Sequence, residues 1–157
     1  MKKLLSIAAV FVMLFAGMSS AMAQTSARKN IVNQPGWGPT GYDYARYYYF
    51  PDKNVYYDVN KKQYIVNEKN KWVYTSTLPK AFDPSKSYKV VVNQDKPYNN
   101  NAAHKREYSK FKGQGPKQAM IKDSKEDKYF ESNDHPRHKE FKAQPQPEKK
   151  DNRNRRN

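Results

Sequence analysis

Residues 41–74 read GYDYARYYYFPDKNVYYDVNKKQYIVNEKNKWVY, and they are the part of the chain that is densest in aromatic and β-branched side chains. Tyr and Val favour the pleated, half-buried surface of a sheet. Here they occur in short runs at residues 47–50, 55–59, 64–67 and 71–77, separated by polar residues typical of turns. This pattern predicts four antiparallel strands that follow one another as hairpins.

A fifth run, SYKVVVN at residues 87–93, follows Pro79 and Pro84. Proline has no N–H for a sheet ladder, so we expect the fourth strand to end before Pro79 and the fifth to start after Pro84. The fold class expected is therefore all-β, a small antiparallel β-meander of four to five strands. We place this β module at residues 36–98.

The hairpin registers can be predicted because side chains alternate along a strand, so that a slip of one residue moves every large side chain to the other face. Loops at residues 51–54, 61–62 and 68–70 bring the largest side chains together. The cross-strand partners then expected are Tyr48 with Tyr57, Phe50 with Val55, Tyr57 with Val66, Val59 with Tyr64, Val66 with Trp72, and Tyr64 with Tyr74.

These registers put the largest side chains on one face of the sheet, which we call the first face and expect to be the core. The predicted core residues are Tyr48, Phe50, Val55, Tyr57, Val59, Tyr64, Val66, Trp72 and Tyr74, with Tyr88, Val90 and Val92 from the fifth strand.

The opposite or second face is more mixed, and tyrosine hydroxyls on it can remain hydrated. We expect any ligand there, beside the neighbouring cations. The candidate ligand-facing residues are Tyr47, Tyr49, Tyr56, Asp58, Arg46, Lys61, Lys62 and Lys89. The alternative for lysines near a sheet edge is that they prevent edge-to-edge aggregation.

Residues 1–23 have the three parts of a secretory signal peptide: two lysines, an apolar run, and Ala-Met-Ala before Gln24. The apolar run is shorter than the roughly 20 residues of a membrane-spanning helix, so no transmembrane segment is expected after the signal is removed. The chain has no Cys, which excludes disulfides and thiolate chemistry. We expect an exported protein of the periplasm or the extracellular space.

The segments around the β module have weaker patterns. Residues 24–35 are expected to be a flexible leader, and Trp37, within a Gly- and Pro-rich turn, is expected to cover one end of the sheet. Residues 99–157 form a basic tail, with a short helix at residues 102–112. Apolar residues are widely spaced over the rest of the tail, which is therefore expected to be disordered.

The net charge of +15 favours anionic partners. The partner classes expected are an anionic envelope polymer or surface, or an envelope protein that docks on the sheet. Nucleic acid is a third candidate, because aromatic and basic residues together can stack bases and contact phosphates, but no sequence motif specifies it.

Catalytic motifs are not apparent. The three histidines, His104, His135 and His138, lie in the tail, where a fixed metal site is not expected. Most carboxylates lie in predicted turns, where Asp is common for backbone reasons; Asp58, in mid-strand, is the exception. We expect no enzyme activity, no metal site and no cofactor.

Residues 36–79 contain the pattern YYYFP-turn-VYYDV-turn-QYI-turn-W, followed by LP and, further on, YKVVV. This pattern resembles a group of small exported bacterial proteins of unknown function. The resemblance extends to about residue 98 and implies a shared β module, without an activity and without functional residues. The group usually has Gly before the Trp of the pattern, where this chain has Asn70.

Overall fold

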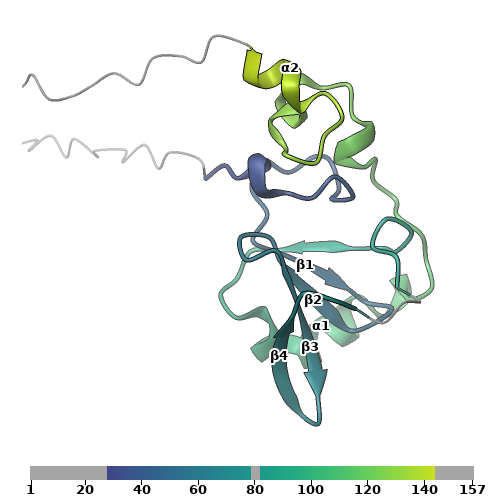
Figure 1. Ribbon diagram of the computed structural model, residues 1–157. Helices are drawn as coiled ribbons and strands as arrows, with labels where there is room; N and C mark the ends of the chain where they lie inside the picture. Colours follow the sequence, from purple (N-terminus) through teal and green to yellow (C-terminus); the bar gives the residue numbers. More distant parts are fainter. Residues whose placement is uncertain (1–27, 79–81, 144–157) are drawn as a thin grey trace, which may run out of the picture.

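The computed structural model of the chain describes residues 28–78 and 82–143 (Figure 1). The expected signal peptide at residues 1–23 lies outside the described residues. So do residues 24–27 of the expected leader and residues 144–157 of the expected tail.

A five-stranded antiparallel sheet forms the centre of the fold, in the order β4-β3-β2-β1-β5. The strands are β1 (Tyr47–Phe50), β2 (Val55–Asp58), β3 (Gln63–Glu68), β4 (Lys71–Thr75) and β5 (Val90–Val92). The expected antiparallel sheet is confirmed, within a mostly-β fold. The expected meander holds for β1 to β4 only, because β5 pairs with β1 and not with β4. The second, fourth and fifth strands are shorter than predicted.

The first hairpin has the predicted register, with Tyr48 opposite Tyr57 and Phe50 opposite Val55. In the second hairpin, Tyr57 pairs with Tyr64 instead of Val66. The connecting loop therefore spans residues 59–62 and not only 61–62. Because the shift is two residues, the side chains keep the faces that were predicted for them.

The third hairpin differs from the prediction by one residue, with Ile65 opposite Tyr74 and Val66 opposite Val73. Lys69 and Asn70 both have positive φ, 48° and 65°. Two such residues form a type I′ turn, whose twist matches that of the strands. The expected three-residue loop was wrong, and the slip moves Trp72 and Tyr74 from the first face to the second.

Both faces of the sheet are packed. On the first face, Trp37 lies 5.4 Å from Tyr48 and 4.9 Å from Tyr57 between ring centroids, so it covers the sheet as expected. On the second face, α1 (Asn101–Glu107) and η2 (Pro97–Asn100) place His104 and Tyr98 over the aromatic side chains. Every residue of β1 and β2 is consequently buried.

The predicted core residues are buried to different degrees. Those that are buried are Tyr48, Phe50, Val55, Tyr57, Val59 and Val92. Those that are half-buried are Tyr64, Val66, Trp72, Tyr88 and Val90. Tyr74 is 37% exposed, so its assignment to the core was wrong. The reason is the two-residue turn of the third hairpin, which places Tyr74 on the outer strand of the second face.

A third apolar cluster, beside those on the two faces of the sheet, joins segments from the two ends of the described chain. These segments lie side by side in Figure 1. Ile31, in η1 (Ile31–Asn33), packs with Ile121, in η4 (Ile121–Asp123), and Tyr129, in η5 (Asp127–Glu131). The backbone N–H of Ile121 donates to the carbonyl of Gly38 at 2.9 Å. All three apolar residues are fully buried.

This cluster corrects two predictions. Residues 28–35 of the expected flexible leader and residues 113–143 of the expected disordered tail are folded. Ile31 from the first segment and Ile121 and Tyr129 from the second are the apolar partners that each segment lacks by itself. The helix expected at residues 102–112 is present as α1 followed by η3 (Ser109–Phe111), and α2 (His138–Ala143) ends the described residues.

Candidate functional site

A hollow of about 360 Å³ opens on the second face of the sheet, beside the β2–β3 loop. Helix α1 covers the other part of this face and leaves the hollow open. The hollow is lined by Arg46, Tyr47, Asp58, Asn60, Lys61, Tyr74, Asp95, Lys96 and Tyr98. Three tyrosines, three cations and two carboxylates therefore meet at one end of the sheet.

The three cations of the hollow have different surroundings. The Arg46 Nη2 atom lies 2.6 Å from Asp95 Oδ1, so this guanidinium is paired. The Lys61 ammonium lies 4.1 Å from the centre of the Tyr74 ring, in a cation–π contact. Among the described residues, no ion pair joins Lys61 or Lys96 to a carboxylate. These two ammonium groups are the ones available to an anionic ligand.

Asp58 shapes the wall of the hollow. Its side chain is only 5% exposed, and its Oδ1 accepts hydrogen bonds from the backbone N–H groups of Asn60 at 3.1 Å and Lys61 at 3.0 Å. A carboxylate that bonds to the N–H groups two and three residues ahead stabilises a turn. Asp58 therefore holds the four-residue β2–β3 loop, and this bond also explains why the loop is wider than expected.

Two tyrosine hydroxyls of the hollow, those of Tyr47 and Tyr74, remain protonated at neutral pH. Burial, followed by the nearby Asp58 carboxylate, raises the pKa of Tyr47 above its usual value. Burial is also the main cause that raises the pKa of Tyr74. Both hydroxyls can therefore donate hydrogen bonds to acceptor oxygens of a ligand.

Four of the eight candidate ligand-facing residues, Arg46, Tyr47, Asp58 and Lys61, line this hollow. Lys62 is exposed in the same loop, with φ 55°. The residues that sequence reasoning missed are Asn60, Tyr74, Asp95, Lys96 and Tyr98. Tyr74 was missed because of the register error, and a type I′ turn at residues 69–70 would have placed it here.

Tyr49 and Tyr56 lie under α1 instead, where a hydrogen-bond network holds them. The Tyr56 hydroxyl lies 2.8 Å from His104 Nδ1, and it accepts a bond of 3.0 Å from Asn101 Nδ2. The Tyr49 hydroxyl donates to Asn54 Oδ1 at 3.1 Å. Burial lowers the pKa of His104, which favours its neutral form. These side chains attach the helix to the sheet, and the expectation that both tyrosines face a ligand was wrong.

Lys89 lies on the first face, away from the hollow. It is 2% exposed, and its ammonium lies 5.7 Å from the centre of the Trp37 ring. Burial lowers the pKa of Lys89 to about 8, and the Asp83 carboxylate opposes part of that shift. The expected ligand-facing role of Lys89 was therefore wrong, because Trp37 covers this part of the sheet.

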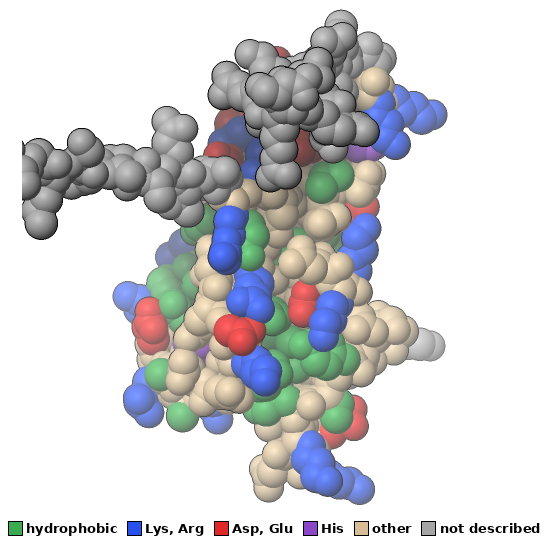
Figure 2. Space-filling model, turned by 90° about the vertical axis from the view of Figure 1, so that its left-hand side faces the viewer, with side chains coloured by type: hydrophobic (Ala, Val, Ile, Leu, Met, Phe, Trp, Pro, Cys, Tyr) green, Lys and Arg blue, Asp and Glu red, His purple; other side chains and the backbone are tan. Residues whose placement is uncertain are grey.

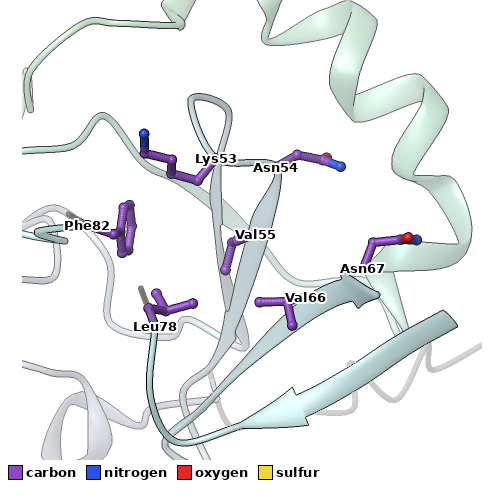
Figure 3. A pocket seen from close by; sticks show the side chains of 7 residues that line it. All are labelled: Lys53, Asn54, Val55, Val66, Asn67, Leu78 and Phe82. Atoms are coloured by element: carbon purple, nitrogen blue, oxygen red, sulfur yellow. The ribbon is translucent and has the colours of Figure 1, made fainter. Parts of the chain in front are cut away.

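A second hollow, of about 410 Å³, lies on the first face (Figure 3). In Figure 3, the side chains of Val55, Val66, Leu78 and Phe82 point toward a common space between the strands and the segment that follows β4. Lys53 lies at its rim, but its ammonium is 3.4 Å from Asp52 Oδ2. This hollow offers apolar contacts and a cation that is already paired, which suits an anionic ligand less well than the hollow on the second face.

Two features are absent from residues 28–78 and 82–143, the part of the chain that the structure describes. There, no group of three His, Asp or Glu side chains is arranged to hold a metal ion. Over the same residues, no helix has the length and apolar character needed to cross a bilayer.

Comparisons of the chain with protein-family models, with curated proteins and with solved structures find no match.

Proposed function

We propose that this chain is a non-catalytic binding protein that holds an anionic partner at the hollow on the second face. The observation that carries the proposal is the pair of ammonium groups, on Lys61 and Lys96, that line one open hollow with three tyrosines. Such a combination provides charge attraction, ring contacts and hydrogen-bond donors at one place.

The rest of the surface supports this proposal. The net charge of +15 attracts anionic polymers and surfaces over a longer range than any single contact. Figure 2 shows one side of the molecule, on which basic side chains are distributed around an area of hydrophobic side chains above the downward-pointing β3–β4 hairpin. We infer that the general charge concentrates the partner at the surface and that the hollow makes the closest contacts.

The proposed place of action is the envelope or the extracellular space. It rests on the signal-peptide pattern of residues 1–23. The partner classes that fit are an acidic polysaccharide, another anionic envelope polymer, or an anionic membrane surface.

The test is a binding titration of the mature chain, residues 24–157, which remains when the expected signal peptide is removed. It is titrated with polygalacturonate and with polyphosphate, at low and at high salt. Lys61→Ala with Lys96→Ala should weaken binding at least about 5-fold if each contact contributes roughly 0.5 kcal/mol. The control is Lys125→Ala with Lys139→Ala, which removes the same charge from exposed positions outside the hollow. Equal losses in the two double variants would contradict a role of the hollow and leave only the general charge.

A second function, docking on a protein partner through the sheet, is favoured by a different observation. Strand β4 forms an outer edge of the sheet, and Tyr74 on this strand is 37% exposed. Salt distinguishes the two functions, because binding to a charged polymer weakens steeply as salt rises.

A further inference from the structure

The outer edge of β4 has backbone groups that no other described segment uses. In an antiparallel hairpin with a two-residue turn, the residues that flank the turn exchange hydrogen bonds, and the bonded pairs then alternate along the strands. Glu68 and Lys71 flank the Lys69–Asn70 turn, so Lys71, Val73 and Thr75 direct their N–H and C=O groups toward β3.

It follows that Trp72 and Tyr74 direct their N–H and C=O groups away from the sheet. Among the described residues, no backbone hydrogen bond outside the sheet involves either of them. An edge of this kind is a template for one more strand.

The charges around this edge specify the chemistry of such a strand. Side chains of directly opposed residues lie on the same face. A residue opposite Tyr74 would therefore point to the second face, where the Lys61 ammonium lies 4.1 Å from the Tyr74 ring centre. A residue opposite Lys71 would point to the first face, beside the Lys71 ammonium. No carboxylate of the described residues forms an ion pair with this ammonium. Both positions favour Glu or Asp.

The positions between them favour apolar residues. A residue opposite Val73 would lie on the first face next to the half-buried Val73 side chain. A residue opposite Trp72 would lie beside the ring that stacks on Tyr98 at 5.8 Å between centroids. An antiparallel strand that fits this edge would thus read acidic, apolar, apolar, acidic from its N-terminus.

We propose that the β4 edge binds an extended acidic segment of a partner protein by strand addition, through the backbone groups of Trp72 and Tyr74. This proposal rests on the second function above. The edge shares Lys61 and Tyr74 with the hollow, so Lys96, which lines the hollow and lies outside β4, is the residue that separates the two proposals. A second copy of this chain fits less well. Antiparallel pairing of two β4 strands about Val73 would place Lys71 opposite Thr75, without a carboxylate for either lysine.

The probe is the peptide acetyl-Thr-Glu-Val-Leu-Glu-amide, titrated to millimolar concentration into the ¹⁵N-labelled mature chain. We expect the amide signals of Trp72 and Tyr74 to shift and their hydrogen exchange to slow, while the Val73 amide, already bonded to β3, changes less. The peptide acetyl-Thr-Lys-Val-Leu-Lys-amide, with the charges reversed, should bind at least about 10-fold more weakly. Unchanged exchange at Trp72 and Tyr74 would overturn the proposal without the need for any variant.

Two substitutions of Tyr74 separate the contribution of its backbone N–H to peptide binding from the contribution of its side chain. Tyr74→Pro removes the outward N–H and leaves the ladder to β3 complete, whereas Tyr74→Val removes the ring and keeps the N–H. We expect the Val variant to bind within about 3-fold of the wild type and the Pro variant to lose at least about 10-fold. Equal affinities of the two variants would contradict strand addition.

Further variants separate this proposal from polymer binding and from self-association. Lys96→Ala should weaken binding of the anionic polymer and leave the peptide affinity unchanged, so that either proposal can fail alone. Sedimentation of the mature chain should show a monomer over the concentrations used. If the wild-type chain is a dimer and the Tyr74→Pro variant is a monomer, a second copy of the chain occupies the edge. That result would overturn the proposal of an acidic segment.

Discussion

Replacing Tyr56 with Phe tests how α1 is attached to the sheet. Tyr56 is fully buried, and its ring contacts Tyr49 and Trp72, at 4.8 and 5.5 Å between centroids. Phe retains these contacts and removes only the hydroxyl. That hydroxyl bonds to His104 Nδ1 and to Asn101 Nδ2.

The expected loss follows from these two bonds. Each neutral hydrogen bond contributes about 1 kcal/mol net, and a buried polar group that loses its partner costs roughly 1–3 kcal/mol. Asn101 keeps its bond of 2.7 Å to Asn54 Oδ1, whereas His104 Nδ1 would have no partner among the described residues. We therefore expect Tyr56→Phe to lower the free energy of unfolding by about 2–3 kcal/mol.

The assay is urea unfolding followed by tryptophan fluorescence, because Trp72 lies against Tyr56 and Tyr98 and responds to the loss of α1. Tyr74→Phe is the matched control at an exposed position, with an expected change within about 0.5 kcal/mol. A double-mutant cycle with His104→Leu should give a coupling of at least about 0.5 kcal/mol. A Tyr56→Phe protein as stable as the control would refute the attachment of α1 by this network.

Three further predictions concern the histidine, the turn and the tail. The folded protein holds the pKa of His104 below that of the unfolded chain, so its contribution to stability is present above about pH 6.5 and is lost as pH falls; unfolding curves between pH 7.5 and 5 measure this, and His104→Leu should flatten the slope. Asn70→Gly should raise the free energy of unfolding by roughly 0.5 kcal/mol, because φ is 65° at this position and Gly has no steric cost there; a lower stability would contradict the type I′ turn. Deleting residues 99–157 should abolish cooperative unfolding, because it uncovers the aromatic side chains under α1 and removes Ile121 and Tyr129 from their cluster. Circular dichroism during heating measures this. If the shortened chain unfolds in a transition as sharp as that of the wild type, the sheet is stable alone.

The sequence predicted the sheet well where local signals were strong. Alternating aromatic residues and the turn at residues 51–54 were sufficient for the first hairpin, and Arg46, Tyr47, Asp58 and Lys61 were grouped near one another for this reason. The third hairpin was misread because Lys69 adopts a left-handed conformation without the glycine that usually signals it.

Other features depend on distant residues and left no local signal. Ile121 and Tyr129 lie in a mostly polar stretch, and their apolar partner Ile31 lies 90 and 98 residues earlier in the chain. Lys96 and Tyr98 belong to the hollow only because the chain after β5 returns across the second face. Periodicity cannot detect such contacts, because it compares only residues within one window.

The cluster of Ile31, Ile121 and Tyr129 also has a consequence for the order of folding. The hairpins of the sheet need only short loops to close, whereas this cluster closes a loop of about ninety residues, and contacts of high sequence separation form late. During synthesis, β1 to β4 can pair as soon as they are available, but residues 28–40 must wait for residues 119–135. Until then Ile31 lacks its contacts with Ile121 and Tyr129, and the turn at Trp37 is held less firmly. The nascent chain therefore exposes apolar surface for most of its elongation. A chaperone would bind the chain during this interval.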